Sequence, residues 1–536
     1  MTTADFTPQT AASIAVARQH AAGDLLRRTA LRYPGKLAVV AGQRRVSFAE
    51  FDAAANRCAN ALAARGVTKG DKIALLSHNS WQYAVLVFAT ARLGAVLVPV
   101  NFMLGAAEIA YILRHSGAAG LITEDALAET AEKALSSAGL TDGVRGWIGL
   151  SGTAPGSGWQ DVDSWIDEGD ATAPAVGVGD DDPLRLMYTS GTESRPKGVM
   201  LSSRSLIAQY VSCAIDGGMS YDDIEVHSLP MYHCAQLDCF FSVDVYLGAT
   251  SIILPGPDPA TLLATIEREK ATKLFCPPTV WISLLRHPDF DTRDLSSLRK
   301  GYYGASPMPV EVLRELSRRL PDMATWNFYG QTEMSPLATI LRPHEQLPHA
   351  GSAGRAALNV ETRVVDDFDE QVPPGEVGEI QIKAANVMKG YWNKEEATKK
   401  AIVEEWFFTG DAGYFDNDGY LYIHDRVKDM IVSGGENVYP AEVENAIFGH
   451  PAVADVAVIG VPDERWGEAV KACVVKKPGA EATPAEIIAW ARERIAGYKL
   501  PKTVDFVETL PRNPTGKVLR RELRKPYWEG RDRQVN

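Results

Sequence analysis

A polar loop at Tyr188–Val199 carries the residues most suited to chemistry, with the sequence Tyr-Thr-Ser-Gly-Thr-Glu-Ser-Arg-Pro-Lys-Gly-Val. The loop follows an apolar run, Leu184–Met187, that predicts a strand, and it precedes a segment predicted as helical. Hydroxyls and backbone N–H groups can surround phosphate oxygens while a lysine supplies positive charge. The loop is therefore predicted to bind a polyphosphate, with a plain glycine-rich turn as the alternative. The candidate phosphate-binding residues are Thr189, Ser190, Gly191, Thr192 and Lys197.

This loop does not fit the phosphate loop of P-loop NTPases. That loop needs a Ser or Thr directly after the lysine. Here Gly198 follows Lys197. The sequence therefore indicates a different class of nucleotide site.

A second group of chemical residues lies at Asn327–Glu333, which reads Asn-Phe-Tyr-Gly-Gln-Thr-Glu and follows a predicted strand. An aromatic ring, a hydroxyl and a carboxylate at the end of a strand suit a magnesium nucleotide. Near the C-terminus, Pro511–Lys517 forms a loop that ends in a lysine. Residues 499–525 around it contain eight basic and three acidic residues, which suits an anionic ligand but is also common on solvated surfaces.

Together these segments resemble the AMP-forming acyl-CoA synthetase family. This family belongs to the adenylate-forming superfamily, which includes carrier-protein adenylation domains and firefly-type luciferases. The resemblance spans essentially the whole chain, and it is greatest to bacterial medium- and long-chain fatty acyl-CoA synthetases. It implies ATP, Mg²⁺ and coenzyme A as cofactors and co-substrates.

The resemblance assigns a role to each nucleotide-site residue. Tyr329 is expected to stack on adenine, Thr332 to contact the α-phosphate and Glu333 to hold Mg²⁺, and Asn327 is expected in the same site. Phe408–Asp411 and Arg426 resemble a ribose clamp, in which Asp411 accepts from both ribose hydroxyls. Lys517 is expected to reach the acyl carboxylate and the α-phosphate during adenylation, where a cation stabilises the developing negative charge.

One departure from the family pattern lies in the phosphate loop. The family commonly has Thr and Gly where this chain has Glu193 and Ser194. A carboxylate beside a triphosphate is repelled, and losing glycine restricts the backbone. Glu193 either points outward or pairs with Arg195.

The acyl pocket is also expected from the resemblance. His233, in Met231–Gln236, is expected to line or gate the carboxylate end, with a buried core histidine as the alternative. Gly304 and Ala305 resemble the pocket-wall loop. The segments Cys239–Tyr246 and Phe275–Trp281 are apolar and aromatic apart from Asp244, which favours a fatty acid over an amino acid. Aryl acids of benzoate or cinnamate type stay open.

The resemblance also predicts a moving C-terminal domain. Lys428 occupies the family's hinge position, about which the domain rotates between two faces. The loop Ser433, Gly434 and Gly435 resembles the one that approaches the thiol tunnel after this rotation. An ordinary flexible turn is the alternative reading of this loop.

The elements that must position these residues follow from hydrophobic periodicity. Strands and helices alternate through the first three hundred residues, which predicts an α/β fold with helix-covered, mostly parallel sheets. For example, Ser47–Arg65 predicts a helix with Ser47 as N-cap and Glu50 in a capping box. Short strands after Gly351 predict a small antiparallel β unit, and a mobile α+β domain follows. The predicted domains are residues 1–427 and 428–536.

Composition limits the classes of function. The chain has 536 residues and a formal charge of −13, which argues against nucleic-acid binding. The six cysteines form no CxxC pair, and neither a signal peptide nor an 18-residue apolar run is found. A cytoplasmic enzyme is predicted, whose partners are a small carboxylic acid and coenzyme A. A homodimer is compatible with the sequence.

Three other functions stay open. A standalone adenylation enzyme would load a carrier protein's phosphopantetheine arm in place of free coenzyme A. A luciferase-type oxygenase would consume oxygen with its adenylate. A non-catalytic nucleotide-binding protein is the third, which the joint presence of Thr332, Glu333, Asp411, Arg426 and Lys517 disfavours.

Overall fold

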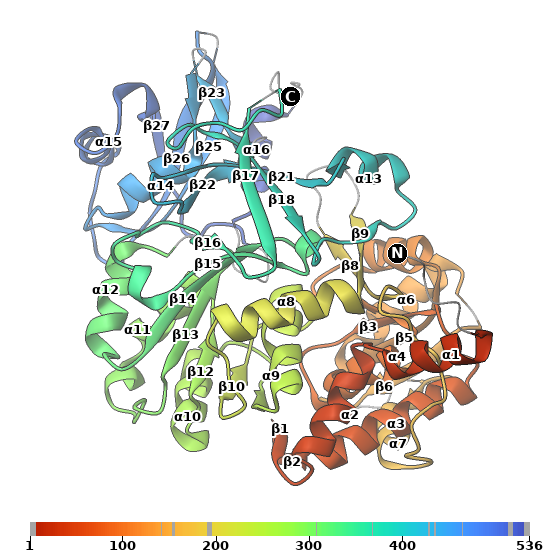
Figure 1. Ribbon diagram of the computed structural model, residues 1–536. Coiled ribbons are helices and arrows are strands. Elements are labelled where there is room, and N and C mark those ends of the chain that lie inside the picture. The colour runs from red at the N-terminus through yellow and green to blue at the C-terminus, as the bar shows by residue number, and fades with distance from the viewer. Residues whose placement is uncertain are drawn as a thin grey trace.

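The protein is described by a computed structural model that contains two large sheets, a small β unit and a C-terminal α+β unit (Figure 1). No helix of the described chain has the length and apolarity needed to cross a membrane. The described residues are 7–140, 142–152, 156–189, 196–306, 308–366, 368–426, 429–433, 436–463, 465–512 and 518–529.

The first large sheet has eight strands, and those at its centre are parallel. At one edge β8 pairs antiparallel with β9, and β9 pairs antiparallel with β19. In spatial order the strands are β19 (Gly390–Tyr391), β9 (Lys197–Ser202), β8 (Pro183–Thr189), β4 (Val96–Pro99), β3 (Lys72–Leu76), β5 (Ala118–Glu124), β6 (Val144–Ile148) and β7 (Gln160–Asp161).

The second large sheet has nine strands and is also parallel through its centre. Antiparallel strands close both of its edges. In spatial order the strands are β16 (Arg355–Ala356), β15 (Leu337–Leu341), β14 (Ala324–Gly330), β13 (Lys300–Gly304), β12 (Lys273–Phe275), β10 (Ile224–His227), β11 (Thr250–Ile253), β1 (Leu37–Ala41) and β2 (Arg44–Ser47).

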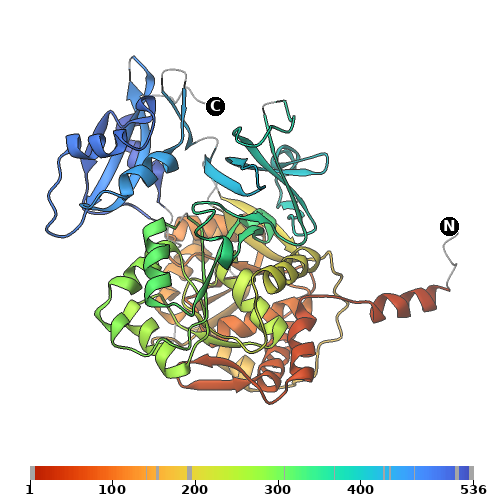
Figure 2. The same cartoon turned by 60° about the vertical axis from the view of Figure 1, so that its left-hand side comes forward.

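Helices cover these sheets, and α4 (Trp81–Leu93) is buried along its whole length because α3 (Phe48–Ala64) and α2 (Gly23–Arg32) pack against it in addition to β4 and β1. By contrast, α1 (Pro8–Ala17) has no buried residue and projects from the body (Figure 2). The covering helices are α2 (Gly23–Arg32), α3 (Phe48–Ala64), α4 (Trp81–Leu93), α5 (Ala106–Ser116), α6 (Ala128–Ala138), α7 (Val162–Asp167), α8 (Ser203–Asp216), α9 (Ser242–Leu247), α10 (Pro259–Glu269), α11 (Pro278–Arg286) and α12 (Val310–Arg319).

The small β unit is antiparallel, as predicted. Its strands are β17 (Val360–Val365), β18 (Gly378–Ala384), β20 (Ile402–Val403), β21 (Trp406–Phe415) and β22 (Leu421–Arg426), with α13 (Glu395–Ala401) beside them.

The C-terminal unit has its own apolar core. Its strands and helices are β23 (Ile431–Ser433), β24 (Glu436–Val438), β25 (Val453–Asp463), β26 (Gly467–Lys476), β27 (Thr503–Phe506), α14 (Pro440–Phe448), α15 (Pro484–Arg492) and α16 (Arg520–Trp528). The unit packs near β22, where the rings of His424 and Tyr439 lie 4.6 Å apart.

Local signals in the sequence predicted individual elements well. The helix after Ser47 begins at Phe48 and has the expected capping box with Glu50. One local prediction is wrong. The phosphate loop leads not into a helix but into β9, and helix α8 begins only after Ser202.

All six cysteines lie buried as free thiols, as expected for small apolar residues.

Candidate active site

The predicted phosphate loop closes a hairpin at the edge of the eight-stranded sheet. Thr189 ends β8 and lies directly opposite Lys197, the first residue of β9. This register brings the two ends of the loop together and sets the lysine at its exit. The predicted residues Ser190, Gly191 and Thr192 fall outside the described residues, as does Glu193.

Lys197 and Glu333 both contact the side chain of Tyr391. The Lys197 ammonium lies 4.8 Å from the centre of the Tyr391 ring. The Tyr391 hydroxyl donates a 2.9 Å hydrogen bond to Oε1 of Glu333. A lysine and a carboxylate from two motifs thus share one neighbour, although 136 residues separate them in sequence (333 minus 197).

Asp411 is a nearly buried carboxylate at the centre of a hydrogen-bond network. Its Oδ2 accepts from the Tyr329 hydroxyl at 2.7 Å and from Nε2 of Gln331 at 2.6 Å. Nε2 of Gln331 also donates to the Thr409 carbonyl oxygen at 2.9 Å. The strand pairing of β21 and β22 sets Arg426 directly opposite Asp411. Adenine-site and ribose-site candidates therefore meet at one carboxylate.

The Thr332 hydroxyl contacts the predicted acyl-pocket segment. Its Oγ1 lies 3.2 Å from Sγ of Cys234. Burial raises the pKa of the Cys234 thiol to about 12, so the sulfur stays protonated at neutral pH. Nδ1 of His233 accepts from the backbone N–H of Ala235 at 3.2 Å, which directs the ring locally. The α-phosphate candidate and the carboxylate-end candidate are therefore neighbours.

Gly304 is the last residue of β13, and Ala305 follows it directly. A Cβ atom at Gly304 would lie 2.5 Å from the Phe328 carbonyl oxygen and 3.9 Å from the Phe275 ring, so glycine is needed there. Ala305 has a φ of 66°, a conformation that costs free energy for a residue with a side chain. Strained backbone of this kind is concentrated at ligand sites.

Behind Gly304 four aromatic rings, which we call the aromatic wall, pack against one another. They are Phe240, Phe275, Tyr302 and Phe328, all buried. The Phe240 ring centre lies 4.3 Å from Phe275, 5.2 Å from Tyr302 and 5.7 Å from Phe328. The Tyr302 hydroxyl donates to the Gly217 carbonyl oxygen at 2.6 Å, so the polar group of the wall is satisfied inside the protein.

Asp244, the acidic residue in the predicted pocket segment, faces a buried ion cluster. Its carboxylate contacts the Lys273 ammonium, and Nε2 of His227 lies 3.2 Å from its Oδ2. Lys273 also lies 2.7 Å from Oε2 of Glu225. Burial disfavours the lysine's charge, but the two carboxylates outweigh it and raise the Lys273 pKa well above its usual value. The cluster has the residue types of a metal site, but the ammonium occupies the cation's place.

Other predicted residues have separate surroundings or fall outside the description. Nδ2 of Asn327, in the middle of β14, donates to the Ser352 carbonyl oxygen at 3.0 Å. Ser433 is a buried residue of β23 that pairs with Glu436. The predicted residues Lys428, Gly434, Gly435 and Lys517 lie outside the described residues, and the Arg426 side chain is likewise not described.

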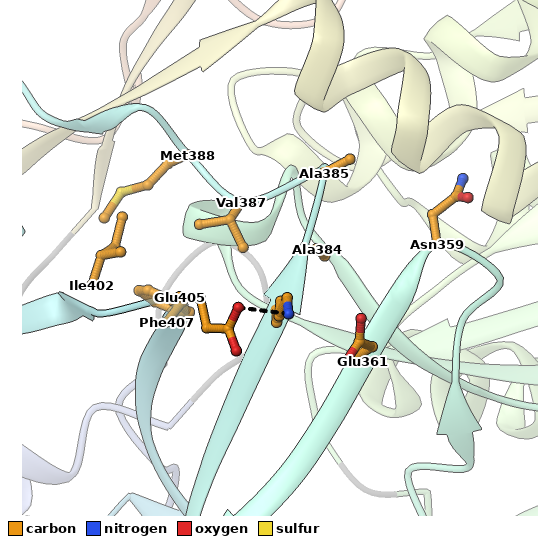
Figure 3. A pocket seen from close by; sticks show the side chains of 10 residues that line it. Asn359, Glu361, Ala384, Ala385, Val387, Met388, Ile402, Glu405 and Phe407 are labelled. Atoms are coloured by element: carbon orange, nitrogen blue, oxygen red, sulfur yellow. Dashed lines mark hydrogen bonds and ion pairs between the residues drawn. The ribbon is translucent and has the colours of Figure 1, made fainter. Parts of the chain in front are cut away.

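A hollow of about 530 Å³ opens on the small β unit (Figure 3). Lys383 and Glu405 form a 2.7 Å ion pair at its rim, and Val387 and Met388 contribute apolar surface. None of the predicted site residues lines it. The backbone N–H of Met388 donates to the Glu333 carbonyl oxygen at 2.8 Å, so this segment lies beside the candidate site.

Three residues of the site were missed by sequence reasoning. Gln331 stands inside a recognised motif, so its polar type was an available signal. Cys234 stands beside His233 but reads as a core residue. Tyr391 has no signal beyond a preceding glycine, because it reaches Glu333 from 58 positions away.

Comparison with known proteins identifies the chain's relatives. The family described as AMP-binding enzyme matches residues 26–392, and the AMP-binding enzyme C-terminal domain matches residues 442–517. A feruloyl-CoA synthase of an Amycolatopsis species is 39% identical over 501 residues, covering 93% of this chain and 98% of that protein. A long-chain-fatty-acid–CoA ligase of Mycobacterium tuberculosis is 39% identical over 483 residues, covering 90% of this chain and 93% of that protein.

Solved structures agree with these relatives. The crystal structure of an anthranilate CoA ligase in complex with anthranoyl-AMP has a TM-score of 0.89 and 29% sequence identity, and it covers 95% of this chain and 97% of that chain. The hairpin, carboxylate network and aromatic wall described above thus belong to a fold that holds an acyl-adenylate in a relative. This chain belongs to the AMP-binding enzyme family and is an AMP-forming acyl-CoA synthetase.

Proposed function

We propose that this acyl-CoA synthetase activates an apolar monocarboxylic acid, with a compact aryl acid as the favoured substrate. The observation that carries the proposal is the aromatic wall, in which Phe240 stacks 4.3 Å from Phe275 behind Gly304. Stacked rings offer flat carbon surface to another ring and prefer such offset packing. The sequence-based prediction of a medium- or long-chain fatty acid stays the second candidate, since the same wall is apolar throughout.

An amino-acid substrate fits the acidic residues of this region poorly. An ammonium group needs a carboxylate partner, and Asp244 already contacts Lys273. Asp238 accepts from the Tyr210 hydroxyl at 3.0 Å and lies 3.9 Å from Arg185. Both carboxylates are thus engaged inside the protein, which supports an apolar acid.

The proposed reaction has two steps. In the first, a carboxylate oxygen of the acid bonds to the α-phosphorus of ATP as the bond to the β-phosphate oxygen breaks, so that acyl-AMP forms and pyrophosphate leaves. In the second, the sulfur of coenzyme A bonds to the acyl carbon as the bond to AMP breaks, and the thiol proton passes to solvent. Lys517 is proposed to stabilise the charge at the α-phosphorus in the first step.

The nucleotide-site residues fit a magnesium nucleotide. Hard cations of this kind take oxygen ligands, and Glu333 has a carboxylate whose Oε1 is oriented by Tyr391. When bound, Mg²⁺ neutralises phosphate charge. Glu333 is the residue proposed to hold it, while Asp411 is proposed to accept from the ribose hydroxyls and Thr332 to contact the α-phosphate.

We further propose a domain alternation between the two steps. The C-terminal domain, residues 428–536, is proposed to rotate about Lys428, which removes Lys517 and brings the loop at Ser433 to the thiol path. Lys428→Pro is expected to spare acyl-AMP formation and to abolish thioester formation. Equal loss of both half-reactions would contradict the hinge assignment.

The substrate is tested by pyrophosphate release over a panel of benzoate-type, cinnamate-type, fatty and amino acids, followed by thioester detection with coenzyme A or a carrier protein. The highest kcat/KM is expected for an aryl acid with free coenzyme A. A tenfold preference for a fatty acid would establish the second candidate instead. Activity on carrier protein alone would replace coenzyme A as acceptor.

A matched pair of variants tests the aromatic wall. Phe240→Leu removes a ring from the wall and is expected to lower kcat/KM for aryl acids by up to about tenfold, as for the loss of one aromatic pair, while sparing fatty acids. Phe290→Leu changes a buried ring elsewhere in the protein and is expected to leave the preference unchanged. An equal effect of the two variants on acid preference would refute the role of the wall.

A further inference from the structure

The two-residue strand β19 joins two parts of the candidate nucleotide site. It pairs antiparallel with β9, so that Tyr391 lies opposite Val199 and Gly390 opposite Met200. The backbone N–H of Trp392 donates to the Gly198 carbonyl oxygen at 2.7 Å. The segment is therefore fixed along the strand that leaves the phosphate loop, directly after Lys197.

The backbone of this strand is held from its other side as well. Gly390 has a φ of 131°, and a Cβ atom there would lie 2.8 Å from Cγ2 of Thr398. Oγ1 of Thr398 accepts a 2.9 Å hydrogen bond from the backbone N–H of Tyr391. The same segment holds the turn of Glu333, since the Met388 N–H donates to the Glu333 carbonyl oxygen. Tyr391 thus stands on a backbone with little freedom.

The Tyr391 side chain uses two different surfaces. Its ring centre lies 4.8 Å from the Lys197 ammonium, and its hydroxyl donates to Oε1 of Glu333 at 2.9 Å. The residue is only 8% exposed, so the Tyr391 side of each contact is buried, while Lys197 and Glu333 are half-buried. Cation–π contacts and hydrogen bonds to carboxylates strengthen when desolvated. The Tyr391 side chain therefore fixes the position of the Lys197 ammonium relative to the Glu333 carboxylate.

We propose that Tyr391 is a positioning residue of the nucleotide site, which orients the Glu333 carboxylate for the metal through its hydroxyl and places Lys197 through its ring. The Tyr391 hydroxyl donates to Oε1 of Glu333, so the other carboxylate oxygen, Oε2, points in a defined direction. This inference rests on the proposed function, because it takes Glu333 and Lys197 as ligands of magnesium and phosphate.

Calorimetry of ATP binding distinguishes the hydroxyl contact with Glu333 from the ring contact with Lys197. Binding is measured once with excess Mg²⁺ and once with EDTA and no metal. Tyr391→Phe keeps the ring and removes the hydroxyl. It is expected to weaken Mg²⁺–ATP binding about tenfold, as for a lost hydrogen bond to a charged group, and to change metal-free ATP binding less than twofold. Tyr391→Leu removes both contacts and is expected to weaken binding in both conditions.

Tyr420→Phe is the matched control. The Tyr420 hydroxyl also donates to a glutamate, Oε1 of Glu345 at 3.0 Å, and both residues are buried. This variant loses the same kind of bond outside the site and is expected to bind ATP normally in both conditions. If Tyr391→Phe weakens both forms of binding equally, or weakens neither, the positioning role is wrong.

A double-variant cycle adds an independent measurement. Glu333→Gln alone removes the metal-binding charge, so adding Tyr391→Phe to it is expected to cost less than a further twofold in Mg²⁺–ATP affinity. Additive losses would overturn the proposal. Failure of the proposed function has a different signature, namely that the protein binds ATP yet no acid releases pyrophosphate. The calorimetric test of Tyr391 measures ATP binding alone, so its result does not depend on pyrophosphate release.

Discussion

Removal of the Lys273 ammonium tests the buried ion cluster that fixes β10, β12 and α9 behind the acyl region. Lys273→Met keeps an unbranched side chain of similar length but leaves Asp244 and Glu225 without their cation. Lys273 and both carboxylates are fully buried, and Lys273 lies 2.7 Å from Oε2 of Glu225. Breaking a buried ion pair by removing one partner costs about 3–5 kcal/mol, since it leaves uncompensated charge.

The pH dependence of this loss has a definite sign. Burial raises the Glu225 pKa well above its usual value, and Lys273 holds the Asp244 pKa below its usual value although burial opposes it. Without the ammonium, burial raises the pKa of both carboxyl groups. The pKa of a carboxyl group in the unfolded chain is about 4. When the pKa is higher in the folded protein, the free energy of unfolding falls as pH rises from the unfolded pKa through the folded pKa. The variant is therefore expected to be less impaired at pH 5 than at pH 8.

The assay is thermal unfolding by calorimetry at pH 5, 6, 7 and 8. At pH 8 we expect Lys273→Met to lower Tm by several degrees, on the order of 1–2 °C for each kcal/mol in a chain of this size. The exposed pair of Lys133 and Glu129 supplies the control, because Lys133→Met breaks an i,i+4 surface ion pair that water screens and that contributes little to stability. Adding Glu225→Gln to Lys273→Met should recover part of the loss. A Tm as high as that of Lys133→Met, or a loss that does not grow with pH, would refute the reasoning.

Three further predictions concern the active site. Lys517→Ala should slow pyrophosphate release about 10²–10³-fold, as for one preorganised charge donor, while thioester formation from supplied acyl-AMP survives; near-normal pyrophosphate release would count against the assigned role. Asp411→Asn should raise the KM for ATP about 10–100-fold, because the carboxylate accepts from Tyr329 and Gln331 and is proposed to accept from ribose; the variant should also discriminate less against 2′-deoxyATP, and unchanged discrimination would exclude a ribose contact. Cys234 should resist maleimide at pH 7–9 in the folded protein and react after denaturation, because it is buried with a pKa of about 12; rapid labelling of the folded enzyme, read by peptide mass spectrometry, would contradict that burial.

Local sequence was sufficient where the interaction itself is local. The capping box of Ser47 and Glu50 involves residues three apart, so their types alone predicted the start of α3. The phosphate loop, Asn327–Glu333 and Phe408–Asp411 were likewise recognisable, because each motif holds several chemical groups within a few residues. The α/β class followed from alternating strand and helix periods. These features depend on neighbours along the chain.

Only the tertiary structure decided which of these groups meet. Strand β9 was missed because its residues are held by β8 and β19 rather than by a local pattern. Asp244 stood out in the sequence as the charged residue of an apolar pocket segment, and only the structure shows that it contacts Lys273. Tyr391 reaches Glu333 across 58 residues, and Tyr329 reaches Asp411 across 82. Contacts of this kind depend on how sheets and loops pack, and side-chain types along one segment do not encode which distant partner a buried polar group will find.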